Sequence, residues 1–323
     1  MRERLAIGPV GFRRLTGVTL AALTLIVMTG AAVRLTDSGL GCPNWPRCYG
    51  GTLPPLSGHA LIEFGNRALS GAVGVLTIVT AIFACTRRPF RRDLAWLALV
   101  LPLGVLAQAV LGGFTVREHL APGFVMAHFS LSMLILIGAV ALAWRARPTA
   151  ATAPGTERDR LSVWAVRALA PLGALTIFAG TAATAAGPHS GGISGDHVHR
   201  LTFEGADTLQ WAIHRHATIA AVFGIAVVGA WLLCRRRGAS ASQQEPLVVL
   251  GVLVAAQGLV GSVQYELHLP ADMVWVHVAL ATLTWLAALW AWADARTPEP
   301  VPPLEVAGAD ARSPAQAREL EAV

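Results

Sequence analysis

Apolar residues gather into eight long runs along the chain, separated by shorter polar segments. Each run is long enough to cross the roughly 30 Å hydrocarbon core of a bilayer as an α-helix. The runs cover residues 15–34, 64–85, 94–114, 122–144, 164–186, 211–234, 246–265 and 272–293. The pattern predicts an all-α integral membrane protein with eight transmembrane helices. The first run lies too deep in the chain, and too many others follow it, for a cleaved signal peptide.

Arginine residues are concentrated in alternate connections between these runs. The clusters comprise Arg2, Arg4, Arg13 and Arg14, then Arg87, Arg88, Arg91 and Arg92, then Arg145, Arg147, Arg158 and Arg160, and finally Arg235, Arg236 and Arg237. The other connections hold few basic residues, mainly Arg47, Arg117 and Arg200. The positive-inside rule therefore predicts a multi-pass protein of the cell membrane, with both termini in the cytoplasm and the arginine-poor loops outside.

The composition agrees with a protein of the lipid bilayer. Hydrophobic residues make up 54% of the 323 residues and charged residues 14%, with a mean hydropathy of +0.55. A soluble domain carries about a quarter charged residues. The formal net charge of +6 is compatible with nucleic-acid binding, but the arginines lie in short clusters between apolar runs, so we expect no nucleic-acid partner. The segment 294–323 is rich in Pro, Ala, Glu and Arg and is expected to be a disordered cytoplasmic tail.

The chain contains an internal repeat with an offset of 148 to 150 residues. The matched pairs are 107–113 with 256–262, Asn66-Arg67 with His214-Arg215, His128 with His277, and Thr29-Gly30 with Ala179-Gly180. Each half holds four spans, so the copies insert with the same orientation and form parallel repeats. We therefore expect two four-helix bundles, 15–146 and 164–293, between a cytoplasmic N-terminus, 1–14, and the tail, and joined by a cytoplasmic linker, 147–163.

None of the ten histidines lies in a segment predicted to be cytoplasmic. His214 and His277 fall at similar depth on the second and fourth helices of the second half. Facing imidazoles on neighbouring helices of a bundle are suited to axial ligation of a heme iron. His216 lies two residues beyond His214 and is expected to point away from that helix face. The repeat match therefore selects His214.

The first half differs from the second at two positions. Asn66 stands where the repeat match places His214, so His128 is the one clear iron ligand. Glu63 shares a helix face with Asn66 and Arg67. Two interpretations of Glu63 are open: an interfacial ion pair with Arg67, or a carboxylate that handles protons or stabilises positive charge beside a substrate. Arg67 and Arg215 either bind heme propionates or extend toward lipid headgroups.

The first outer loop contains Cys42 and Cys48. Because disulfides form on the oxidising side of the membrane, we expect these two residues to be paired. His197 and His199, in a later outer loop together with His189, have a spacing that allows metal binding. A solvated loop is the interpretation we favour.

The segment Glu63-Phe64-Gly65-Asn66-Arg67 resembles the E-x-x-H/N-R motif of heme A synthases. His128, His214-Arg215, His277 and the paired cysteines match further positions of that family, and the resemblance extends over residues 14–293. The family converts heme O to heme A for terminal oxidases by oxidising a ring methyl group to a formyl group.

The resemblance implies different tasks for the two halves. The second half would hold a heme b cofactor through His214 and His277. The first half would receive the substrate heme O near His128, with Glu63 as the catalytic residue. Expected partners are a heme O synthase, a terminal oxidase or its assembly factors, and a second copy of the chain. The rival functions are an electron-relaying diheme cytochrome and a heme carrier; the presence of Glu63 in one half only favours the enzyme.

Overall fold

The computed structural model describes residues 6–51, 53–147, 159–193, 196–203 and 207–295 of the chain. These residues form eight helices: α1 (Pro9–Leu35), α2 (Gly58–Thr86), α3 (Arg92–Arg117), α4 (Pro122–Arg145), α5 (Arg160–Ala186), α6 (Thr208–Arg236), α7 (Ala241–Glu266) and α8 (Ala271–Asp294). Each predicted apolar run lies inside one of these helices, and each helix is long and apolar enough to cross a membrane. The all-α prediction with eight spanning helices is confirmed.

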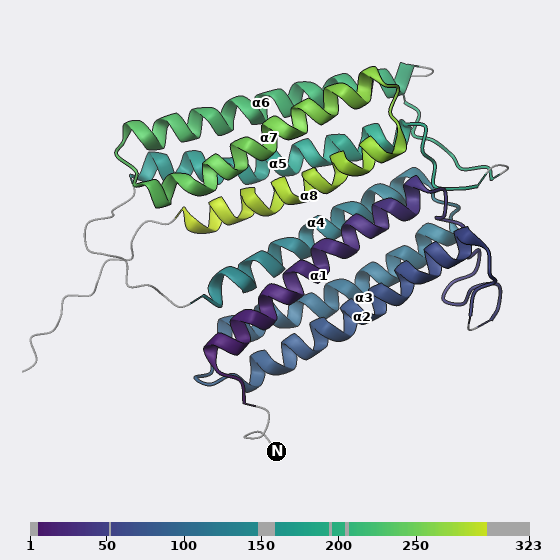
Figure 1. Cartoon of the computed structure of the whole chain (residues 1–323), viewed down its shortest axis with the longest axis horizontal. Coiled ribbons are helices and arrows are strands. Elements are labelled where there is room, and N and C mark those ends of the chain that lie inside the picture. Colours follow the sequence, from purple (N-terminus) through teal and green to yellow (C-terminus); the bar gives the residue numbers. More distant parts are fainter. Residues whose placement is uncertain (1–5, 52, 148–158, 194–195, 204–206, 296–323) are drawn as a thin grey trace, which may run out of the picture.

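The helices are arranged as two groups of four, α1–α4 and α5–α8 (Figure 1). The groups meet along α1 and α4 on one side and α5 and α8 on the other. Two tryptophans of α8 join them, because the Trp275 indole donates a hydrogen bond to the carbonyl oxygen of Met28 (3.0 Å) and the Trp285 indole to that of Met133 (3.0 Å). Helix α8 is thereby bound to both α1 and α4 of the first half.

The connections alternate between the two ends of the molecule (Figure 1). The loops after α1, α3, α5 and α7 lie together at one end, and the arginine-rich connections lie at the other. At the arginine-rich end, Asp294 accepts hydrogen bonds from the Trp144 indole (2.5 Å) and the Arg147 guanidinium (2.7 Å). The predicted tail lies outside the described residues from position 296 onward, as does most of the predicted linker.

The short α3–α4 and α7–α8 turns are built alike. His119 and Leu120 have φ values of 48° and 58°, and their repeat equivalents His268 and Leu269 have 61° and 63°. Non-glycine residues are uncommon in this left-handed region. Its recurrence at an offset of 149 residues indicates that the two helix pairs share one backbone design.

Candidate functional site

Two imidazoles face each other inside the second half. The rings of His216 on α6 and His277 on α8 have centroids 6.2 Å apart and planes inclined at 78°. Nδ1 of His216 forms a hydrogen bond with the carbonyl oxygen of Thr176 on α5 (3.0 Å). A histidine held in this way through one nitrogen presents the other to a metal. Gly180 makes the approach to α5 feasible, because a Cβ there would lie 3.0 Å from Cε1 of His216.

The prediction that His214 faces His277 is wrong, because His216 is the residue that lies against His277 and His214 is exposed. The cause is the register of the repeat between α2 and α6. Gly74 and Gly224 occupy equivalent places, since a Cβ on either would lie 3.5 or 3.4 Å from a valine of the following helix. Their separation is 150 residues, so the structural equivalent of Asn66 is His216. Matching the His-Arg and Asn-Arg pairs in sequence had shifted this register by two residues.

Glycines also make room for the histidines of α4 and α8. A Cβ on Gly112 would lie 3.2 Å from Cε1 of His128, and a Cβ on Gly261 would lie 3.1 Å from Cε1 of His277. Both distances are shorter than ordinary van der Waals contact, so a larger residue would displace the ring. The Nδ1 atoms of His128 and His277 are buried and have no hydrogen-bond partner within the described part of the chain. Each Nδ1 atom is therefore a nitrogen that could bind a metal and that makes no hydrogen bond to the described part of the protein.

Asn66 fills the place in the first half that His216 occupies in the second. The Thr29 hydroxyl of α1 donates to Oδ1 of Asn66 (2.8 Å) and to the carbonyl oxygen of Ile26 (3.2 Å). Ile26 is the equivalent of Thr176, the residue that binds His216. An amide bound to a hydroxyl therefore replaces an imidazole bound to a carbonyl, and imidazole is the side chain that suits iron.

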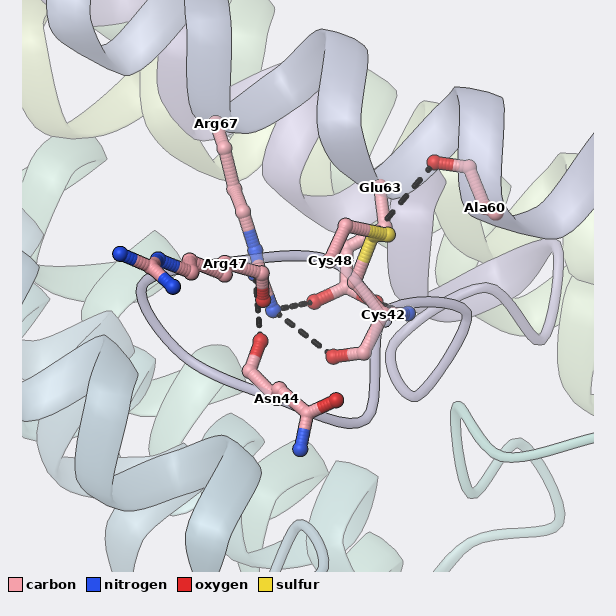
Figure 2. Close-up of polar contacts among 7 residues, drawn as sticks. All are labelled: Cys42, Asn44, Arg47, Cys48, Ala60, Glu63 and Arg67. Atoms are coloured by element: carbon pink, nitrogen blue, oxygen red, sulfur yellow. Dashed lines mark hydrogen bonds and ion pairs between the residues drawn. A yellow bond between two sulfur atoms is a disulfide. The ribbon is translucent and has the colours of Figure 1, made fainter. Parts of the chain in front are cut away.

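Glu63 is 5% exposed and holds the first outer loop onto α2 (Figure 2). One carboxylate oxygen, Oε1, accepts a hydrogen bond from Nη2 of Arg67 (2.5 Å), and Oε2 accepts one from the main-chain N–H of Cys42 (2.6 Å). The ion pair considered from the sequence is therefore present. The carboxylate contributes a second contact as well, since it binds the loop directly.

Arg67 extends this contact along the loop (Figure 2). Its Nη2 also donates to the carbonyl oxygen of Cys42 (3.0 Å), and its Nη1 donates to those of Asn44 (2.9 Å) and Arg47 (3.4 Å). The guanidinium thus binds three loop carbonyls and one carboxylate. These bonds occupy the guanidinium fork for which the sequence left two interpretations open, a heme propionate or lipid headgroups.

The expected disulfide between Cys42 and Cys48 is present, and both residues are buried. The loop fits closely against the ends of the helices. A Cβ on Gly41 would lie 2.4 Å from the carbonyl oxygen of His59, and a Cβ on Gly113 would lie 2.8 Å from the ring of Trp45. Glycine is therefore required at both places, and the loop packs against the N-terminal end of α2 and the C-terminal end of α3.

The corresponding loop of the second half is held by arginines. Arg34 of α1 donates to the carbonyl oxygens of Thr184 (3.1 Å) and His189 (3.0 Å), and Arg200 donates to those of Thr184 and Gly187. Burial lowers the pKa of the Arg200 guanidinium. Sequence reasoning missed this role of Arg34, which joins the first half to the carboxyl end of α5, where cations are favoured.

The remaining predicted residues lie away from the paired imidazoles. Arg215 is exposed and lies over the ring of Trp211, with its guanidinium carbon 5.5 Å from the ring centroid. His197 and His199 are exposed. His189 binds the carbonyl oxygen of Leu269 (2.7 Å), which gives it a structural role in the loop.

The donor set fits an iron porphyrin better than a metal held by protein alone. No group of three or more His, Cys, Asp or Glu side chains suited to a metal occurs among the residues that the structure describes. A porphyrin supplies four nitrogens itself and needs only axial ligands from the protein. Metal–imidazole bonds of about 2 Å place two axial rings with centres roughly 6 Å apart. The 6.2 Å between His216 and His277 matches that separation.

Comparison with known proteins gives one family and several relatives. The profile of a family described as "Cytochrome oxidase assembly protein" (COX15-CtaA) matches residues 13–61 and 56–289. A protein of Shewanella oneidensis named heme A synthase is 33% identical over 183 residues, which are 50% of this chain and 51% of that protein. A heme A synthase of Symbiobacterium thermophilum is 34% identical over 155 residues, 45% of this chain and 50% of that one. The chain thus spans about half the length of these relatives in the matched regions.

Proposed function

The chain belongs to the family of cytochrome oxidase assembly proteins, and from this premise we propose that it is a heme A synthase. It would oxidise a methyl group of heme O to the formyl group of heme A. The observation that carries the proposal is the unequal pair of sites at equivalent places in the two halves. One site has two facing imidazoles, and the other has one imidazole, an amide and a nearby buried carboxylate.

The second half is the proposed cofactor site, where His216 and His277 would hold the iron of heme b. This assignment replaces His214 by His216, because His216 is the residue that faces His277. The bound heme supplies a one-electron redox centre. Thr176 holds the His216 ring through Nδ1, and Gly261 leaves room for the His277 ring. Both contacts fix the imidazoles before the heme enters, which reduces the entropy lost on binding.

The first half is the proposed substrate site, with His128 as the single axial ligand of heme O. Asn66 leaves the opposite coordination position open. Glu63 is the proposed catalytic carboxylate. Conversion of a methyl group to a formyl group replaces two hydrogens by one oxygen atom and removes four electrons from the carbon, so the reaction requires an external electron acceptor. A carboxylate beside that carbon can accept a proton and stabilise developing positive charge.

The hydrogen bonds of Glu63 suit this role. Arg67 and the Cys42 N–H orient the carboxylate, since both donate hydrogen bonds to it. The disulfide loop packs closely against the ends of α2 and α3, beside the buried Glu63. The arginine distribution supports a cell-membrane location with both termini in the cytoplasm. Heme O synthase and a terminal oxidase or its assembly factors remain the proposed partners.

The test is the heme content of cells that make heme O but lack a heme A synthase. Expression of the full chain should produce heme A, identified by chromatography and mass spectrometry of extracted hemes. Cells carrying the empty vector are the control. Purified protein that contains heme, in cells without heme A, would instead indicate an electron relay or a heme carrier.

A further inference from the structure

Two glutamines occupy equivalent positions beside the predicted axial histidines of α4 and α8. Gln108 on α3 and Gln257 on α7 are 149 residues apart, and each lies four residues before the glycine that makes room for the ring. The side-chain oxygen of each glutamine is buried and has no hydrogen-bond partner within the described residues. Buried amide oxygens are normally satisfied, so the pair requires an explanation.

The two glutamines make different contacts. Nε2 of Gln257 lies 3.4 Å from Nε2 of His277, so this amide faces the imidazole ring. Nε2 of Gln108 donates instead to the carbonyl oxygen of His128 (2.9 Å) and to the hydroxyl of Ser132. The amide of Gln108 is therefore bound to the backbone and the serine. Nδ1 lacks a partner within the described residues in both rings, so the two rings differ at Nε2, where His277 has the Gln257 amide.

One position on the neighbouring helix accounts for this difference. Ser132 lies four residues after His128, and its equivalent four residues after His277 is Ala281. Alanine offers no hydroxyl to compete for the amide. A half-turn of the Gln257 amide exchanges its nitrogen and oxygen. The oxygen then accepts the ring N–H of His277, and the other ring nitrogen keeps a free lone pair for a metal.

We propose that Gln257 is a positioning residue that anchors the His277 imidazole. In the first half, Ser132 binds the Gln108 amide and thereby prevents it from binding the His128 ring. The inference rests on the proposed function, because it concerns the hemes of the two sites. A second hydrogen bond fixes the orientation of a ligand histidine and raises its basicity. The anchored ring suits a resident cofactor. The unanchored ring suits a substrate site that must release its product after each reaction.

The second-half test uses the purified full-length protein in a His128→Ala background, loaded with heme b. Gln257→Leu and Ala281→Ser should each speed the transfer of heme to apomyoglobin about tenfold, the usual scale of such effects. Both should also shift the reduction midpoint potential of the bound heme. Gln244→Leu is the control, because Gln244 lies on the same helix and binds the carbonyl oxygen of Ala239 (2.7 Å).

The first-half test uses a His277→Ala background. Ser132→Ala should free Gln108 to bind the His128 ring and slow heme transfer about tenfold. Transfer rates and potentials that stay unchanged in all three variants would overturn the anchoring proposal, whether or not heme A is made. Changed transfer rates in a protein whose wild type forms no heme A would refute the proposed function alone.

Discussion

The two halves share a backbone design and differ in the side chains placed on it. In the second half, His216 and His277 face each other across the bundle, and His216 is bound to a carbonyl of α5. In the first half, Asn66 replaces one imidazole and binds Thr29 instead. Glu63 has no charged equivalent in the second half. Under the proposed function, the comparison teaches that one helix arrangement would serve a permanent cofactor or a transient substrate, depending on how many strong ligands it presents.

The outer loops extend this comparison. The first-half loop is closed by a disulfide and held by Glu63 and Arg67. The second-half loop is held by arginines that bind main-chain carbonyls, including Arg34 from the other half. The carboxylate of the first half thus connects the loop to the proposed substrate site. The second-half loop connects the two bundles.

The largest effect is expected from His216→Ala, which breaks the second-half pair. The variant should lose the low-spin heme of the second half, because one axial ligand is removed. Optical spectra of the reduced protein provide the measurement. His214→Ala is the matched control and should keep the spectrum, since His214 is exposed. Loss of the spectrum in His214→Ala but not in His216→Ala would instead support His214 as the ligand, as the sequence match predicts.

Glu63→Gln should remove the carboxylate that distinguishes the first half from the second. We expect heme A formation to fall at least about 100-fold, which is the scale of a lost acid–base group, while heme b stays bound. Heme extraction and the reduced spectrum measure the two outcomes separately. Glu266→Gln, at an exposed outer end of α7, is the control. Normal heme A output from Glu63→Gln would exclude the catalytic role.

Replacing both Cys42 and Cys48 by serine tests the loop of the first half. A disulfide between residues six positions apart stabilises by about 2 kcal/mol through the unfolded state. The thermal midpoint in detergent should therefore fall by a few degrees, and heme A formation should drop because Glu63 loses a fixed donor. Cys85→Ser, at an exposed free thiol, should change neither quantity. An unchanged midpoint in the double variant would mean that the loop is held by other contacts.

The smallest effect is expected from Gly261→Ala. The added Cβ would lie 3.1 Å from Cε1 of His277 and displace the ring slightly. Overpacking of this kind costs about 1 kcal/mol, which corresponds to roughly fivefold weaker heme b binding. Gly258→Ala on the same helix meets no atom within 4 Å and is the control. Equal heme affinity in both variants would show that the ring position tolerates the added methyl.

The sequence predicted all eight helices, but it selected one wrong histidine for the site of the second half. Hydropathy located all eight helices because each apolar run must cross the bilayer. The match of His128 with His277 agrees with the structure in one respect, since each ring lies against a glycine at the same offset, Gly112 and Gly261. The α2–α6 match is wrong because it follows two similar dipeptides, Asn66-Arg67 and His214-Arg215, instead of the small residues at the helix contacts that set the register. The matched glycines, Gly74 and Gly224, carried the correct offset and were overlooked.

Other features depend on contacts between segments that are far apart in the chain. The bond from Glu63 to the Cys42 N–H and the reach of Arg34 to the carboxyl end of α5 are examples. No local pattern of residues encodes them, because each joins a helix to a loop whose path is set by packing. The disulfide was predictable, since its two cysteines lie in one short loop.

The left-handed turns after α3 and α7 imply that the protein is less stable than its topology permits. Each turn holds a histidine and a leucine at positive φ, where a side chain costs on the order of 1 kcal/mol relative to glycine. Glycine at the two exposed histidine positions, His119 and His268, would recover part of that strain, whereas Leu120 is buried and packs beside Gly39 and Gly191. Substitutions in these turns therefore offer a way to make the protein more stable in detergent without changing either proposed heme site.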